Sequence, residues 1–344
     1  MKFSLKTNIS VSYITLITLL LVVCKDVYNQ DLSRVTNLKR EWKFSIGDHV
    51  EWSTKDFNDQ DWDEIWVPGK WEDQGFHGYN GYAWYRTYFR IEDHFSTLPV
   101  YLSLGYIDDV DEVYVNGHLI GKTGSFLPNY TTAYNAKRFY RIPKNILQAN
   151  GENTIAVRIY DEGGEGGIIH GDIAIMIDFD AIPVDYDLQG TWKFKTHDCK
   201  IVKNEEWDFS DWDEIMVPGI WENQAYKSYD GIASYAIEFN LSNEFDGVRM
   251  VLVLGKIDDL DQVYLNGKLI GQSGSFTKDA LYNNPDFHQQ LRGYYLPLDA
   301  LNKGKNILIV KVLDAGGFGG LYEGSVGLIT QDHYIDYWRA RRNK

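Results

Sequence analysis

The sequence has few cysteines and few basic residues, and each shortage excludes a class of protein. Its 344 residues include two cysteines, Cys24 and Cys199, which excludes a framework of several disulfides. Acidic residues outnumber Lys and Arg by 49 to 34, so the formal net charge is −15. Nucleic acids and anionic membrane surfaces are bound by clustered basic side chains. A neutral or weakly charged ligand therefore suits this chain better.

The sequence also lacks a hydrophobic run long enough to cross a membrane. The apolar stretch at residues 13–23 is too short for a span, and it follows Lys2 and Lys6 as the core of a secretory signal does. We therefore predict that residues 1–30 are a signal peptide. The segment ending at Cys24 resembles a bacterial lipoprotein signal, and lipidation of Cys24 is the alternative processing. Either way, we expect an exported bacterial protein of the periplasm or of the outer-membrane or cell surface.

Most of the chain consists of two tandem copies of one domain. The run Ile107–Phe126 returns as Ile257–Phe276, with 14 of 20 positions identical. Earlier landmarks are offset by 150 residues and later ones by 153. We predict one domain at residues 32–181, a second at 184–332, a junction within 178–188, and a basic, solvated tail at 333–344.

Alternating hydrophobicity predicts short β-strands in both copies. Val100–Leu104 and Thr154–Tyr160 place every second apolar side chain on one face. Asn116-Gly117 and Asn266-Gly267 are strong signals for a β-hairpin turn. No comparable helical periodicity is present in either copy. These patterns predict an all-β fold of two tandem antiparallel β-sandwiches with jelly-roll connections.

Several motifs in order resemble the sugar-binding jelly-roll domain, also called galactose-binding-like, of family 2 glycoside hydrolases. They are the stretch 62–72 (WDEIWVPGKWE), the stretch 81–86 (GYAWYR), the hairpin at 113–117 (VYVNG), and the segment 153–161. Similar modules occur in bacterial β-galactosidases, β-glucuronidases and sialate O-acetylesterases. The resemblance covers both copies and implies a carbohydrate context. The first copy is the better candidate for a sugar site, because Trp84 and Arg86 become Ser234 and Ala236 in the second.

The resemblance does not imply catalysis, because those enzymes keep their catalytic carboxylates in a separate barrel domain that this sequence lacks. Motifs for a serine or cysteine nucleophile, a His-x-x-x-His metal site and a phosphate loop are also missing. We therefore expect a non-catalytic carbohydrate-binding protein that helps a bacterium to capture or degrade polysaccharide. The alternatives are a β-galactosidase-like hydrolase component whose active site another chain completes, and a scaffold that docks onto a separate hydrolase.

The candidate sugar-binding residues combine aromatic rings with planar polar groups, which is the pairing that a pyranose needs. In each copy an aspartate stands at the end of a predicted strand and precedes a glycine-rich loop. In some related hydrolases an aspartate at this strand end projects into a sugar subsite. A glycine loop that serves only a tight crossover is the competing interpretation. The full set of candidates is His77, Tyr79, Tyr82, Trp84, Arg86, Asp161, His170 and Asp314. For Trp71 and Trp221, which recur in both copies, we favour packing.

The acidic run Asp108, Asp109 and Asp111 has three interpretations. The first is structural, with the carboxylates satisfied by turn amides and by a partner such as Arg86. The second is a structural calcium ion, because oxygen-rich loops suit a hard cation. The third is a glycosidase acid pair, but carboxylates on adjacent positions of a turn do not by themselves set the required separation. No other cofactor is indicated.

Overall fold

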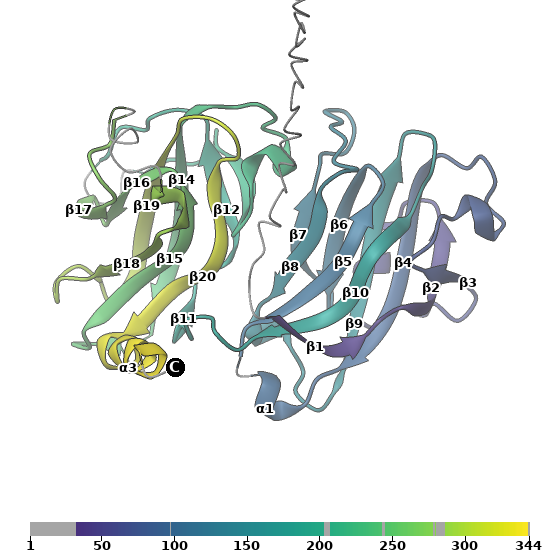
Figure 1. Ribbon diagram of the computed structural model, residues 1–344, viewed down its shortest axis with the longest axis horizontal. Helices are drawn as coiled ribbons and strands as arrows, with labels where there is room; N and C mark the ends of the chain where they lie inside the picture. Colours follow the sequence, from purple (N-terminus) through teal and green to yellow (C-terminus); the bar gives the residue numbers. More distant parts are fainter. Residues whose placement is uncertain are drawn as a thin grey trace, which may run out of the picture.

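The computed structural model describes residues 32–96, 98–202, 207–242, 245–277, 279 and 286–342. The predicted signal peptide, with Cys24, lies outside the described residues. The described chain forms two β-sheet units side by side (Figure 1), which we call unit 1 and unit 2. They follow the two copies seen in the sequence.

Unit 1 contains ten strands, one short α-helix and three 3₁₀ turns among its described residues. They are β1 (Leu32–Asn37), β2 (Arg40–Ile46), η1 (Val50–Ser53), β3 (Asp63–Val67), η2 (Glu72–Gln74), β4 (Gly81–Arg90), α1 (Asp93–Ser96), β5 (Val100–Ile107), β6 (Val110–Val115), β7 (His118–Thr123), β8 (Lys137–Ile142), η3 (Lys144–Ile146), β9 (Glu152–Asp161) and β10 (Ile168–Asp178).

Unit 2 repeats this order and ends in a longer helix. Its elements are β11 (Tyr186–Asp187), β12 (Gly190–Lys195), β13 (Asp213–Val217), η4 (Trp221–Gln224), β14 (Gly231–Leu241), β15 (Met250–Asp258), β16 (Leu260–Leu265), β17 (Lys268–Gln272), η6 (Phe287–Gln289), β18 (Leu291–Tyr295), β19 (Gly304–Asp314), β20 (Gly320–Thr330) and α3 (Gln331–Arg342).

Each unit has one four-stranded and one six-stranded sheet, with matching strand order. In unit 1 the orders are β1-β10-β5-β8 and β3-β2-β4-β9-β6-β7; in unit 2 they are β11-β20-β15-β18 and β13-β12-β14-β19-β16-β17. Neighbouring strands within every sheet are antiparallel. The prediction of an almost all-β, antiparallel fold is therefore confirmed, while the jelly-roll connections stay a prediction.

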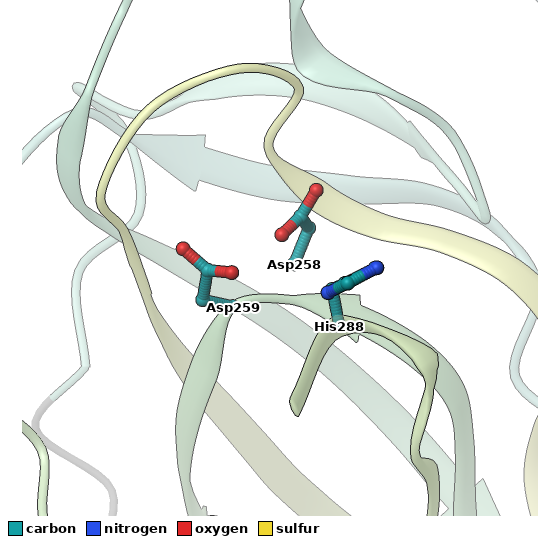
Figure 2. A group of neighbouring side chains, drawn as sticks. All are labelled: Asp258, Asp259 and His288. Carbon is teal, nitrogen blue, oxygen red and sulfur yellow. The ribbon is translucent and has the colours of Figure 1, made fainter. Parts of the chain in front are cut away.

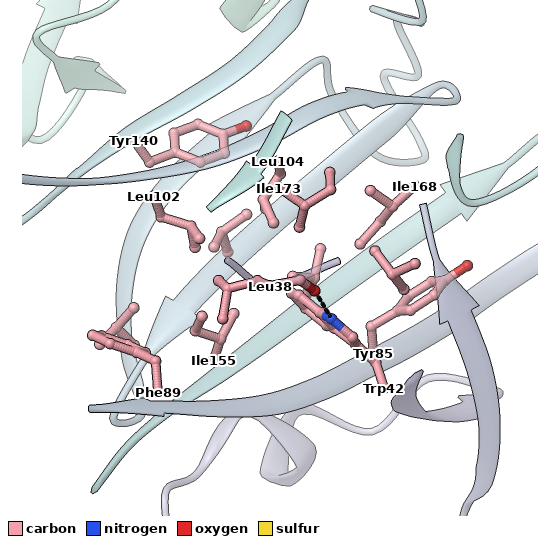
Figure 3. Close-up of a cluster of buried hydrophobic side chains, with 14 of the residues drawn as sticks. Leu38, Trp42, Tyr85, Phe89, Leu102, Leu104, Tyr140, Ile155, Ile168 and Ile173 are labelled. Carbon is pink, nitrogen blue, oxygen red and sulfur yellow. Dashed lines mark hydrogen bonds between the residues drawn. The ribbon is translucent and has the colours of Figure 1, made fainter. Parts of the chain in front are cut away.

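The two sheets of unit 1 share a single hydrophobic core. Leu102 and Leu104 come from the four-stranded sheet, and Phe44, Tyr85 and Ile155 come from the six-stranded sheet. Figure 3 shows this packing and the hydrogen bond from Trp42 Nε1 to the carbonyl of Leu38, at 2.9 Å. In unit 2, Trp192 Nε1 donates to Leu188 in the same way, at 2.7 Å. The tryptophan indole thus anchors the strand entry in both cores without leaving a buried donor unpaired.

The Asn-Gly hairpins are present where the sequence predicts them. Asn116 and Gly117 join β6 to β7, and both have positive φ, at 51° and 83°. The amide of Asn116 donates to Ile146 O and Asn153 Oδ1, both at 2.8 Å. Asn266 makes the same pattern in unit 2, to Ala300 O and Asn306 Oδ1. The turn is therefore fixed by its backbone and by a partly buried side chain.

The junction between the units is held by the C-terminal helix. Residues that we predicted as a solvated tail form α3, in which the Tyr337 hydroxyl and Arg341 Nη1 donate to the Asp180 carbonyl, at 2.7 and 2.6 Å. Tyr334 and Tyr337 pack against a small cluster that contains Ile182. This burial of aromatic rings explains why the segment folds onto the protein despite its basic end. Within the described part of the chain, no helix is long and apolar enough to span a membrane.

Candidate functional site

The structure does not gather the predicted sugar-binding residues of unit 1 into one open site. Trp84 and Arg86 lie on the outer face of β4, and both are fully buried. Arg86 Nε donates to Asp59 Oδ2 at 2.8 Å, and Nη1 donates to the carbonyl of Thr54 at 3.0 Å. These contacts place the segment between β2 and β3 over the sheet. Arg86 therefore holds a loop, and its partner is Asp59 rather than the acidic run at 108–111.

The remaining aromatic and histidine candidates of unit 1 are dispersed. Tyr79 packs on the core against Trp71 and donates its hydroxyl to Tyr82 O at 2.7 Å. The Tyr82 ring lies parallel to Phe126, and the Arg158 guanidinium lies over both rings. His77 and His170 are exposed at separate positions, and His170 contacts the ring of Tyr106. Trp71 and Trp221 are fully buried, as the packing interpretation predicts.

The strand-end aspartates Asp161 and Asp314 are both fully buried. Each accepts a hydrogen bond from an amide of its glycine loop, with Asp161 Oδ1 to Gly163 N at 3.0 Å and Asp314 Oδ1 to Gly316 N at 2.8 Å. Burial raises the pKa of Asp161 to about 6. The loops themselves are tight, because a Cβ on Gly166 would lie 2.0 Å from the Trp71 ring. This packing supports the crossover interpretation of the glycines.

The acidic run of unit 1 is divided between a turn and the core. Asp111 is fully buried, where Oδ1 accepts from Arg138 Nε at 2.6 Å and Oδ2 accepts from the Tyr140 hydroxyl at 2.5 Å. Asp109 Oδ2 accepts from Glu162 N at 2.8 Å. Burial, followed by the neighbouring charge of Asp109, raises the pKa of Asp108 to about 7. Among the described residues these three aspartates do not bring their oxygens within 4.8 Å of one another, so the calcium site stays a prediction.

A concave surface lies between the units. It is a cleft with a cavity volume of about 80 Å³, and both units contribute to its walls. We call it the inter-unit cleft; its aromatic and polar lining includes Tyr101, Phe139, Arg141, Gln189, Tyr322 and Glu323. Direct contacts also join the units, including Gly124 N to Asn223 O at 2.7 Å. The rings of Tyr101 and Phe139 stack, with centroids 4.8 Å apart.

Several buried polar atoms in the inter-unit cleft have no partner among the described residues. They are the Tyr101 hydroxyl, Arg141 Nε and Nη1, and both amide atoms of Gln189. The Arg141 side chain is only 9% exposed, and its Nη2 lies 3.3 Å from Asp187 Oδ2. Burial raises the pKa of Tyr101 to about 12, so its hydroxyl keeps its proton and can donate. A hydroxyl group, of solvent or of a ligand, both donates and accepts and so matches this set of donors and acceptor.

Sequence reasoning missed the inter-unit cleft because it compared the copies and looked for features that they share. Two of its polar and aromatic lining residues differ between the copies, since Tyr101 corresponds to Val251 and Arg141 to Tyr295. A polar or aromatic residue on a predicted strand, replaced by a different type in the other copy, is the signal that could have identified them.

Comparisons with known proteins find matches over part of this chain. Residues 47–165 match a family described as "Beta-galactosidase second all-beta domain". A putative β-glucuronidase from Formosa agariphila is 28% identical over 160 residues, which are 43% of this chain and 14% of that protein. Residues 47–165 are therefore similar to an all-β domain of β-galactosidases.

Solved structures of β-glucuronidases and related enzymes are also similar to this chain. One from Bacteroides uniformis covers 82% of this chain and 28% of its own length, at 15% identity and a TM-score of 0.36. A family 2 glycosyl hydrolase from Bacteroides cellulosilyticus covers 82% of this chain and 32% of its own length, with the same identity and TM-score. The chain therefore spans less than a third of the length of these enzymes.

Proposed function

We propose that the protein is an exported, non-catalytic carbohydrate-binding protein, built from two jelly-roll domains, that holds a saccharide in the inter-unit cleft. The observation that carries this proposal is the set of unpaired, buried polar atoms beside stacked aromatic rings. Sugar hydroxyls both donate and accept hydrogen bonds, so they can replace ordered water at Arg141, Gln189 and Tyr101. The relationship of residues 47–165 to a β-galactosidase domain supports carbohydrate as the ligand class.

The lining of the inter-unit cleft favours binding over hydrolysis. A glycosidase needs two carboxyl groups at a fixed separation across the scissile bond. Among the described lining residues Glu323 is the one carboxylate, and its Oε1 accepts a hydrogen bond from Lys256 Nζ at 2.7 Å. A single, paired carboxylate cannot supply both an acid and a base or nucleophile. We accordingly propose that any degradation is performed by a separate hydrolase, with this protein, free or anchored through Cys24, near the bacterial surface.

A panel of neutral and acidic oligosaccharides, titrated calorimetrically, tests the proposal. We expect one saccharide per chain, and Arg141→Ala should weaken its binding about tenfold because it removes at least one buried hydrogen bond. Arg90→Ala is the matched control, because Arg90 is exposed on unit 1 away from the cleft. Absence of binding across the panel, or equal binding by Arg141→Ala, would contradict the proposal. Release of reducing sugar would instead support the hydrolase alternative.

A further inference from the structure

Unit 2 brings two carboxylates and one imidazole together at the end of its sheets. Asp258 ends β15, Asp259 follows it directly, and His288 lies in η6. Their ligand atoms all lie within 4.8 Å of one another, and each residue is partly buried. Figure 2 shows the three side chains converging from the two segments. A metal ion at the centre of such a group would contact all three.

The backbone that carries these side chains is fixed by its own hydrogen bonds. The backbone carbonyl of Asp259 accepts a hydrogen bond from Arg292 Nη2 at 2.6 Å. The side-chain Oδ2 of Asp259 accepts one from Ala315 N at 3.1 Å. The carbonyl of His288 accepts from the Tyr322 hydroxyl at 2.9 Å. Because ligand positions are held by neighbouring donors, little reorganisation is needed on binding.

The negative charge of this group is not balanced by a basic side chain among the described residues. Arg292 donates to the backbone of Asp259, but its ion pair is with Asp261, at 2.8 Å. Asp314 and Glu222 add further negative charge on the same side. Burial, then the neighbouring Asp259, raises the pKa of Asp258 well above its usual range. Either a shared proton or a cation must offset this repulsion.

Unit 1 has the equivalent two aspartates but lacks the equivalent histidine. Arg138 bonds the carbonyls of Ala133 and Ala136 as Arg292 bonds those of Phe287 and Gln290. This correspondence places exposed Tyr134 where unit 2 has His288. Unit 1 therefore retains the aspartate pair, as Asp108 and Asp109, without the imidazole.

We propose that Asp258, Asp259 and His288 bind one divalent transition-metal ion of the zinc class. Two carboxylates and an imidazole form a mixed oxygen and nitrogen donor set, which suits Zn²⁺ and its neighbours. Calcium prefers six to eight oxygen ligands, and this group offers too few. Three protein ligands leave at least one coordination position for water.

Titration of the purified full chain with ZnCl₂ in a metal-free, non-chelating buffer tests the site. We expect one equivalent of Zn²⁺ to bind per chain. CaCl₂ at the same concentrations should not compete.

His288→Tyr, which copies the unit 1 residue, should weaken Zn²⁺ binding by more than about a hundredfold, beyond the loss caused by mutating a group that only supports a ligand. Asp258→Asn should do the same, and it provides a second variant if the first melts abnormally. Asp108→Asn in unit 1 is the matched control and should leave the stoichiometry unchanged. Binding of Ca²⁺ in preference to Zn²⁺, unchanged affinity in both unit 2 variants, or no bound equivalent would each overturn the site.

Discussion

The outer faces of the two six-stranded sheets are both covered by a loop, but different interactions hold that loop in each unit. In unit 1 the covering loop is held by a buried ion pair between Arg86 and Asp59. The corresponding residues of unit 2 are Ala236 and Phe209, which belong to a hydrophobic cluster with Trp207 and Trp212. Buried ion pairs and apolar residues of similar volume can be close in net stability. The exchange shows that this sheet face is covered in both units, whereas the interactions that hold the covering loop differ.

A second buried network is the same in both units. Arg138, Asp111 and Tyr140 in unit 1 correspond to Arg292, Asp261 and Tyr294 in unit 2, with equivalent hydrogen bonds. Each arginine also donates to backbone carbonyls of the loop before its strand. The contrast suggests which polar groups this fold needs and which it can replace.

The largest expected effect comes from breaking that shared network. Arg138→Ala leaves the fully buried Asp111 carboxylate without its counter-charge, so we expect a loss of roughly 3 to 5 kcal/mol in unit 1. Arg292→Ala should cost unit 2 a similar amount. Hydrogen exchange followed separately in the strands of each unit measures both. A loss below about 1 kcal/mol in either unit would show that the shared network is not required.

Breaking the ion pair between Arg86 and Asp59 should reduce the stability of unit 1 more than replacing both residues with apolar ones. Arg86→Ala should destabilise unit 1 by about 3 kcal/mol, because Asp59 stays buried without a partner. The double variant Asp59→Phe with Arg86→Ala, which copies unit 2, should recover most of this loss. Denaturant midpoints measure both, and Arg90→Ala, in an exposed pair, should change stability by less than about 1 kcal/mol. Equal destabilisation of the single and double variants would contradict the comparison.

A smaller loss is expected at the hairpin asparagines, where the units agree. Asn116→Ala removes the side chain that bonds Ile146, Asn153 and Thr154 N, and should cost about 2 kcal/mol. Asn266→Ala should behave alike in unit 2. Asn58→Ala, on an exposed loop, is the control and should stay within about 0.5 kcal/mol. Thermal melting of each variant tests whether the two hairpins are equivalent.

The last expected effect concerns pH. The folded-state pKa of Asp108, about 7, lies above the ordinary value for an aspartate of 3.8. The folded state therefore binds this proton more tightly than the unfolded state, and stability is lost as pH rises from about 4 to about 7. Asp108→Asn should flatten that part of the melting temperature profile. An unchanged slope would show that Asp108 does not titrate in this range.

The sequence was sufficient for the repeat, the strands and the hairpins because these depend on local alternation and turn chemistry. Thr154–Tyr160 lies in β9, and Asn116-Gly117 joins β6 to β7, as predicted. The site was harder, since alternation does not tell which face of β4 is covered. Trp84 and Arg86 read as exposed binding groups, yet a loop from residues 48–62 buries them. The inter-unit cleft depends on how two domains pack, which no local pattern encodes.

The contact between α3 and the junction of the two units also bears on the inter-unit cleft. Tyr337 and Arg341 hold the backbone of Asp180, the residue at which the chain leaves unit 1. Turning one domain about this connection would break both hydrogen bonds at once. The helix thus acts as a splint, and residues outside the lining of the inter-unit cleft help to hold its two walls in place.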